Sequence, residues 1–271
     1  MNSTDQNASE SPKPTYRSRT GRFSPSMGWK AFLSEILIVV LGIVIALGAA
    51  DIVEEWNWQR KVALAEIKLK VEANRNYRFA VEQVIVGPCI ATQLDALQKR
   101  LLNSGDVLNP APVFNDTIFN QFVYRIPSRP YVQSVWQALN SDGTASHMND
   151  WRQQMYAQMY TQKLDLTERT RTKTFVLYAR SSMLSVPIPL DQSTRAMLLA
   201  DLMEQRVSSS FQSRVAIQIM SQMRDLGLTP TAKDIEKFLQ ESGTLAFCKK
   251  QGLPLADWKL ELAKEPVQKQ L

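Results

Sequence analysis

Two cysteines and a single histidine are the residues of this chain with the most reactive side chains. Cys89 and Cys248 stand about 160 residues apart in the sequence. They could form a disulfide if the domain lies outside the cytoplasm, or stay as two unlinked, buried thiols. A bridge across so long a loop would stabilise the fold by on the order of 5 kcal/mol in the chain-entropy model. Both alternatives stay open at the level of the sequence.

His147 follows a turn signal at residues 140–143 and lies close to Asp150 in the sequence. A histidine in this setting is more often a helix-start or surface residue than a general base. Two thiols and one histidine are too few for a structural zinc site, which uses four nitrogen or sulfur ligands. The sequence also lacks a nucleophile elbow, a P-loop, a glycine-rich dinucleotide turn and a paired-histidine motif. We therefore predict a protein that is not an enzyme and binds no cofactor or metal.

The strongest signal in the sequence is an uncharged apolar run of fifteen residues from Ile36 to Ala50. Extending the run back to Ala31 gives twenty residues, interrupted by only two polar ones. Twenty helical residues at roughly 1.5 Å each reach across the roughly 30 Å of a bilayer core. A buried helix of a soluble core is the alternative, but such a helix normally keeps a polar stripe, which is missing here. We therefore predict a transmembrane helix over residues 29–51.

Some polar and small residues of this span suggest specific roles. Glu35 lies near the start of the span, where its carboxylate can reach the headgroups or pair with Lys30, so an interfacial role is favoured over an ion pathway. Gly42, Ala46 and Ala50 form two consecutive small-xxx-small steps, a spacing that lets helix backbones approach closely in lipid. Self-association into a homo-oligomer through this face is one hypothesis, and a simple monomeric anchor is the other.

Tryptophans flank the span on both sides, with Trp29 before it and Trp56 and Trp58 after it. Indole rings favour the level of the lipid headgroups. Together with Lys30 and Glu35, we expect these three residues to act as interfacial anchors.

A cleaved signal peptide is the main alternative to an anchor, because residues 48–50 are small, as a signal peptidase requires. The long segment of about thirty residues before the run argues against cleavage, and so does the helical pattern that continues through Asp51. In the nearest nine residues, two basic side chains precede the span and none follows it, which favours an N-terminus in the cytoplasm. A wider count is tied. We expect residues 1–28 to be a disordered, basic cytoplasmic tail.

The run from Ser34 to Leu47, followed by residues 55–57 and Arg60, resembles the N-terminal segment of a bacterial family of uncharacterised single-span membrane proteins. In that family a Glu precedes an apolar run with a central Gly and a late Ala, then come Trp-Asn, a basic residue and a long charged helix. The resemblance covers residues 29 to about 76, although family members usually have Gly in place of Ser34 and a shorter spacing to Trp-Asn. It implies a bacterial cytoplasmic membrane protein with no assigned activity, and it carries over no catalytic residues.

The charge of the remaining chain argues against a nucleic-acid partner. Residues 51–271 carry 27 basic and 23 acidic side chains, spread along the sequence without an evident cluster. A nucleic-acid surface would need Lys and Arg gathered on one face.

Beyond the span, helical spacing of apolar residues and the lack of period-two alternation predict an all-α chain. We expect a helical stalk over residues 52–86, a helical bundle-like soluble domain over residues 87–254 and a C-terminal tail over residues 255–271. The apolar positions that define the stalk helix are Val53, Trp56, Leu64, Ile67, Val71, Val81 and Val84. Gly87-Pro88 is expected to break or kink this helix, with Pro88 able to start the next one.

The domain is predicted to hold several helices separated by Pro- and Gly-containing turns. A proline-rich connection over residues 103–130 would contain at most one short helix. Asp191 is expected to cap one helix and Gly227 to end the helix before residue 228. The helices expected after the connection cover residues 131–139, 148–183, 191–207, 211–226 (continuous with the previous one or restarted), 231–241 and 255–264.

These features favour a non-enzymatic, membrane-anchored interaction or scaffold module of the bacterial cell envelope. Its partners would be the lipid bilayer and an unidentified envelope protein or a second copy, with the C-terminal domain periplasmic or extracellular. The alternative is a sensor that binds a small ligand between the helices of residues 148–226 and signals through the stalk. That hypothesis requires a buried, partly polar cavity in this region.

Overall fold

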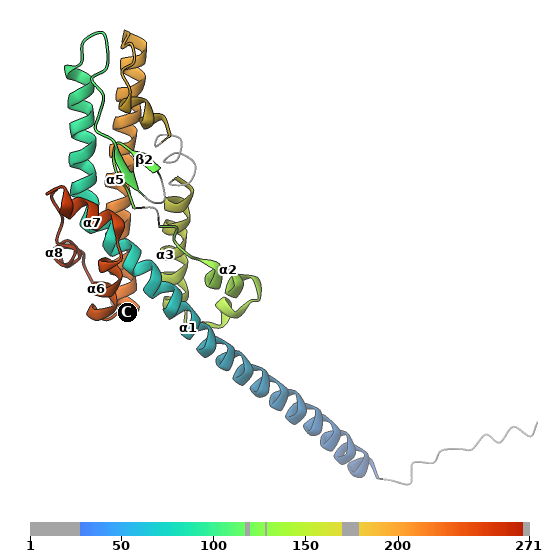
Figure 1. Cartoon of the computed structure of the whole chain (residues 1–271). Helices are drawn as coiled ribbons and strands as arrows, with labels where there is room; N and C mark the ends of the chain where they lie inside the picture. The colour runs from blue at the N-terminus through green and yellow to red at the C-terminus, as the bar shows by residue number, and fades with distance from the viewer. Residues whose placement is uncertain (1–27, 117–119, 128, 170–178, 268–271) are drawn as a thin grey trace, which may run out of the picture. The chain divides into compact units, whose positions relative to one another are not determined.

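The protein is all-α, as the sequence predicts, with one short antiparallel hairpin (Figure 1). The computed structural model describes residues 28–116, 120–127, 129–169 and 179–267. Its elements are α1 (Trp29–Asn103), β1 (Phe114–Asp116), β2 (Asn120–Phe122), α2 (Ser134–Ser141), η1 (Thr144–His147), α3 (Asp150–Arg169), η3 (Ser182–Ser185), α5 (Gln192–Asp225), α6 (Ala232–Gln240), α7 (Gly243–Lys250) and α8 (Trp258–Ala263).

The chain divides into two compact units, Met1–Glu55 and Trp56–Leu271. In the first unit, the structure describes the beginning of α1, whose apolar side chains are exposed. The expected tail over residues 1–28 lies outside the described residues, apart from Gly28. The second unit contains the remainder of α1 and every element after it.

In the second unit, α1 is a core helix rather than a stalk. Ala65, Leu69, Ala73 and Tyr77 are buried in the hydrophobic core, long before the predicted end of the stalk at residue 86. The small alanine side chains on this face let neighbouring segments approach the helix closely. The predicted division at residue 86 therefore differs from the structure, because periodicity shows that a helix is amphipathic but not what covers each face.

Pro88 bends α1 without ending it (Figure 1). Of the break and the kink that the sequence allowed at Gly87-Pro88, the structure shows the kink, and Pro88 does not start a new helix. Proline has no amide hydrogen and clashes with the preceding turn, and both effects open a helix locally. The backbone N–H of Ala256 donates to the carbonyl of Ile85 at 2.9 Å, beside this bend. A Cβ added to Gly87 would lie 2.9 Å from Ser213 Oγ, so the glycine allows a close approach of α5.

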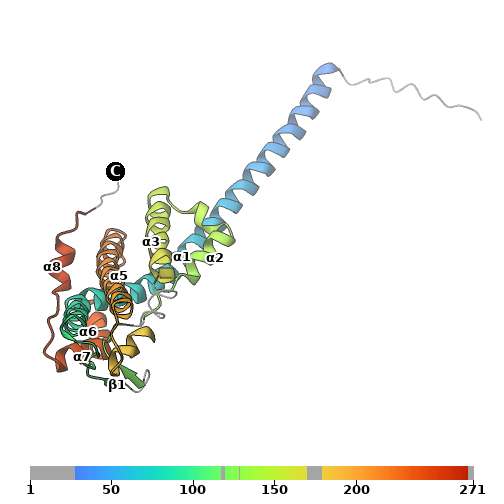
Figure 2. The same cartoon turned by 90° about the horizontal axis from the view of Figure 1, so that it is seen from above.

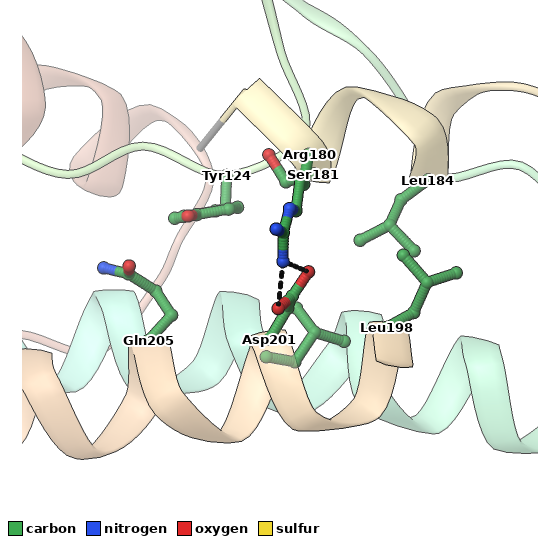
Figure 3. Close-up of a pocket in the computed structure, with 8 residues that line it drawn as sticks. Tyr124, Arg180, Ser181, Leu184, Leu198, Asp201 and Gln205 are labelled. Carbon is green, nitrogen blue, oxygen red and sulfur yellow. Dashed lines mark hydrogen bonds and ion pairs between the residues drawn. The ribbon is translucent and has the colours of Figure 1, made fainter. Parts of the chain in front are cut away.

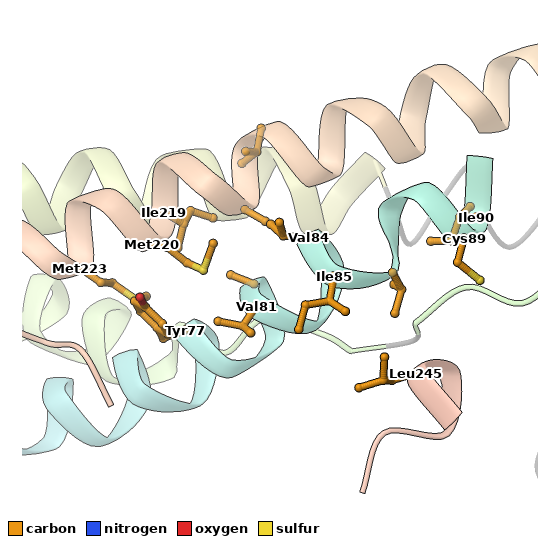
Figure 4. Close-up of a cluster of buried hydrophobic side chains, with 14 of the residues drawn as sticks. Tyr77, Val81, Val84, Ile85, Cys89, Ile90, Ile219, Met220, Met223 and Leu245 are labelled. Carbon is orange, nitrogen blue, oxygen red and sulfur yellow. The ribbon is translucent and has the colours of Figure 1, made fainter. Parts of the chain in front are cut away.

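The core of the second unit lies between α1 and α5, which run side by side (Figure 1, Figure 2). Figure 4 shows Tyr77 and Val84 of α1 beside Met223 and Met220 of α5. All four side chains are buried. Helix α5 runs without a break from Gln192 to Asp225, which resolves the alternative of one helix or two in favour of one.

Local sequence signals placed several helix ends correctly. The side chain of Asp191 accepts a hydrogen bond from Thr194 N, as an N-cap does. Gly227 has a φ of 72°, the left-handed conformation that ends a helix. Helix α7 was not predicted; it begins at Gly243, and the side chain of Ser242 caps it.

In the middle of the chain, one predicted helix is replaced by strands, and another is only partly covered by the described residues. Residues 114–122 contain strands β1 and β2, where Phe114 pairs with Phe122, instead of a short helix. Three-residue strands are too short to show an alternating pattern. The helix expected over residues 148–183 is observed as α3 up to Arg169, while residues 170–178 lie outside the described residues.

A segment outside the helices, described at residues 125–127 and 129–133, runs along α1 in the opposite direction and is held by buried polar side chains of that helix. Polar side chains at uneven intervals along α1 hold the segment and the start of α2. Most of them bind backbone groups, and Glu82 binds the guanidinium of Arg129. The contacting pairs, in order, are Gln93 with Arg125, Glu82 with Arg129, Asn76 with Val132 and Glu72 with Val135.

Asn76 forms the most complete of these contacts. Its amide nitrogen donates to Val132 O at 2.7 Å, and its side-chain oxygen accepts from Val132 N at 2.8 Å. A segment without a partner strand leaves its backbone groups unsatisfied, and burial makes that costly. The asparagine side chain replaces the missing strand at this point.

Glu72 joins the segment to two helices. It accepts hydrogen bonds from Val135 N at 2.9 Å, in the first turn of α2, and from the hydroxyl of Tyr160 in α3 at 2.5 Å. Burial raises the pKa of Tyr160 well above its usual range, and the hydrogen bond to the Glu72 carboxylate acts in the same direction. The tyrosine therefore stays a neutral donor throughout the physiological pH range.

We predict that Asn76→Ala lowers the free energy of unfolding by about 2 to 4 kcal/mol, because it leaves the buried N–H and C=O of Val132 without partners. Urea denaturation of the full chain in detergent, followed by circular dichroism, measures this change. Asn57→Ala is the matched control, since Asn57 is exposed on the same helix. Equal stabilities for the two variants would contradict the role assigned to Asn76.

Candidate functional site on the first helix

The first candidate site is the apolar part of α1 in the N-terminal unit. The helix is long and apolar enough there to cross a membrane, and none of the most apolar window is buried by the rest of the chain. Apolar surface costs about 25 cal/mol per Å² when it is exposed to water. The stretch is thus compatible with a single membrane span, although a signal sequence would show the same features.

The residues predicted for self-association are accessible in this unit. Gly42, Ala46 and Ala50 are exposed, and a Cβ added to Gly42 would meet nothing within 4 Å. Packing within the described part of the chain therefore does not explain the small side chains. Their use in a contact between helices stays a prediction.

The predicted interfacial anchors fall into two groups. Trp29, Lys30 and Glu35 are exposed near the start of α1. Trp56 is also exposed, and the guanidinium of Arg60 lies 4.9 Å from the centre of its ring. These four residues are free of core packing, as interfacial side chains would be.

Trp58 differs from the other anchors, because its ring packs within the second unit. The imidazole of His147 stacks on it with ring centroids 4.0 Å apart, and the ammonium of Lys61 lies 4.1 Å from its centroid. His147 is an exposed residue at the end of η1. The tryptophan and histidine thus connect η1 to α1.

Cys89 of α1 and Cys248 of α7 form a disulfide, with Cα atoms 6.0 Å apart. Both residues are fully buried. The side-chain amide of Gln93 donates to Cys89 Sγ at 3.3 Å and also contacts Arg125, so the bond lies beside the segment before α2. Of the two alternatives that the sequence left open, the structure shows the bridged one.

The outward face of α1 after Trp56 carries exposed apolar side chains at helical spacing. Trp56, Leu64, Ile67 and Val71 are 58%, 61%, 63% and 68% exposed. Residues three and four apart lie on the same side of a helix, so these positions form a single stripe. The sequence groups them with Val81 and Val84 as the apolar positions of one helix. Of this set, only Val81 and Val84 are buried.

The same face is basic. Between Trp56 and Arg78 the sequence contains six basic and two acidic residues. Both acidic residues are engaged within the unit: Glu66, which is partly exposed, pairs with Arg152 at 2.7 Å, and Glu72 is buried. The exposed basic residues on the outward side are Arg60, Lys61, Lys68, Lys70 and Arg75.

Asp142, at the end of α2, interacts electrostatically with the lysines of this face. Hydrogen bonds from Thr144 lower the pKa of Asp142, and the charges of Lys61 and Lys68 add to the effect. The exposed positions of these residues on α1 bring together basic side chains that look evenly spread in the sequence. We call the stripe and its flanks (Trp56, Arg60, Lys61, Leu64, Ile67, Lys68, Lys70, Val71 and Arg75) the basic-apolar face.

A small pocket lies between η3 and α5, near an exposed ion pair of Arg180 and Asp201 at 3.2 Å (Figure 3). The buried amide of Gln205 lines it, and its oxygen accepts no hydrogen bond within the described part of the chain. The volume of about 10 Å³ is at the lower limit for one water molecule. A pocket for a metabolite would be at least tenfold larger.

The chain matches no protein-family model, no curated protein and no solved structure. The resemblance of residues 29–76 to a family of single-span membrane proteins therefore stays a prediction.

Sequence reasoning missed the basic-apolar face because it used the apolar residues only to define a stalk helix. One signal could have revealed it. Arg60, Lys68 and Arg75 occur three or four residues from the apolar positions, whereas the acidic residues fall on the opposite side of the helix. A face that combines apolar and basic residues without acidic ones differs from an ordinary solvated face.

We predict that reducing the Cys89–Cys248 bond lowers the free energy of unfolding by up to about 5 kcal/mol, because the bond closes a loop of 159 residues. Urea denaturation of the full chain in detergent, with and without dithiothreitol, measures the loss. The double variant Cys89→Ala/Cys248→Ala should be less stable than the oxidised wild type and should not respond to dithiothreitol. Two titratable thiols in the unfolded, unreduced wild type would refute the bond.

Proposed function

We propose that the protein is a single-span membrane protein whose helical C-terminal unit lies outside the bacterial cytoplasm and binds another envelope protein. The exposed apolar stretch of α1 carries this proposal. Without lipid around it, about five turns of continuous apolar helix would face water, and a monomeric soluble protein rarely exposes so large a patch. A bilayer is the environment in which this surface is stable.

The disulfide supports the location of the C-terminal unit. Disulfides form and persist in the periplasm and outside the cell, whereas cytoplasmic thiols are kept reduced. The two basic side chains close to the N-terminal side of the apolar stretch favour the same orientation, with the N-terminus in the cytoplasm. The bond and the charge bias are independent observations.

An interaction role is supported by the basic-apolar face, which remains exposed beside an otherwise well-packed core. Residues described by the structure include no group of three or more metal-ligating side chains. The absence of catalysis and of a cofactor remains a prediction from the sequence. Sensing of a small ligand would need a cavity of ligand size, and the pocket beside Gln205 does not provide it.

Labelling of single introduced cysteines tests the topology. We expect a membrane-impermeant maleimide to label Lys233→Cys, an exposed position in α6, in intact spheroplasts. Ser18→Cys, on the other side of the span, should be labelled only after detergent lysis. Native Cys89 and Cys248 are bonded to each other and should not react. Protection of Lys233→Cys together with labelling of Ser18→Cys would reverse the orientation and remove the proposed function.

A further inference from the structure

We propose that the basic-apolar face of α1 docks an acidic amphipathic helix of a partner protein. The inference rests on the proposed function and adds the binding surface and the chemistry of the partner. It begins from the exposed stripe of Leu64, Ile67 and Val71, each more than half exposed. Single exposed apolar residues are ordinary, but three at steps of three and four form a continuous strip.

The width of the stripe favours a helix as the occupant. Lys61 and Lys68 flank the apolar side chains on one side, and Lys70 flanks them on the other. The apolar sector is therefore narrow, as in the seam of a helix pair, whereas a helix that inserts into a lipid surface presents a broad apolar face. Amphipathic helices bind such seams through side chains at three- and four-residue spacing.

Charge complementarity selects an acidic partner. Arg60 and Arg75 are each four residues from an apolar residue of the stripe and so lie on the same side of the helix. A partner that covers the stripe must accept their hydrogen bonds or neutralise their charge. Glu66 and Glu72 are engaged with Arg152 and with Val135 and Tyr160. Asp142 interacts with Lys61 and Lys68 at the edge of the face. Carboxylates beside an apolar seam on the partner would pair with the two arginines.

A second copy of this chain fits the face poorly. Two copies that enter the membrane through the same segment would lie parallel, and their basic-apolar faces would place like charges opposite each other. Such contacts are destabilising. Self-association through Gly42, Ala46 and Ala50 is a separate hypothesis that does not involve this face.

Site-specific photo-crosslinking in native membranes tests the proposal. A benzophenone amino acid replaces Ile67 in the full-length protein, and a second protein carries it at Glu236, an exposed residue of α6. We expect ultraviolet light to give an adduct from position 67 with another protein. Mass spectrometry of the crosslinked peptide should show an amphipathic segment with net negative charge.

Charge reversal supplies the matched comparison. We expect Lys68→Glu/Arg75→Glu to reduce the adduct from position 67 about tenfold or more, because it places like charges across the interface. Lys233→Glu/Lys237→Glu makes the same change in charge on α6, where both side chains are exposed, and should leave the adduct unchanged. A circular dichroism spectrum and a urea midpoint equal to those of the wild type show that each variant is folded.

The outcomes separate the inference from the function on which it rests. Adducts with a second copy or with lipid alone, adducts insensitive to Lys68→Glu/Arg75→Glu, or a partner segment without net negative charge would each overturn the docking proposal. Adducts from position 236 but not from position 67 would overturn it and leave the interaction role intact. The absence of protein adducts from both positions would remove both.

Discussion

Contacts between buried polar side chains of α1 and the segment before α2 are the interaction on which the second unit depends. The described residues 125–127 and 129–133 pair with no described strand, so their backbone groups need other partners. Gln93 and Asn76 bind the backbone of this segment, Glu72 accepts from Val135 N in the first turn of α2, and Glu82 pairs with the guanidinium of Arg129. The segment lies along α1 and leads to the start of α2.

These contacts also link the parts of the unit that follow. Glu72 receives the hydroxyl of Tyr160 from α3, and Glu82 receives that of Ser242, which caps α7. The disulfide ties α7 to α1 near the bend at Pro88. Because the inner face of α1 is occupied in this way, its outer face is the part of the helix left for contacts with other molecules.

Features encoded by local chemistry could be predicted from the sequence. The apolar stretch, the cap at Asp191 and the left-handed Gly227 each depend on residues within a few positions. The all-α class follows from the spacing of apolar residues. These signals do not require knowledge of what lies across the fold.

The remaining features depend on contacts between distant segments. A helical period shows two faces of α1 but not that Ala65 and Leu69 would be covered while Leu64 and Ile67 would not. A polar residue such as Asn76 looks like part of a solvated face until its partner, 56 residues away, is known. The state of the cysteines likewise depends on the approach of α7 to α1.

The central claim is that the apolar part of α1 holds the protein in a membrane. Its most direct test is fractionation of cells that express the full-length chain, with an alkaline carbonate wash of the membranes before ultracentrifugation. The account predicts that the protein stays in the pellet after the wash and enters the supernatant only when detergent is added. Recovery of the full-length chain in the supernatant without detergent would contradict it.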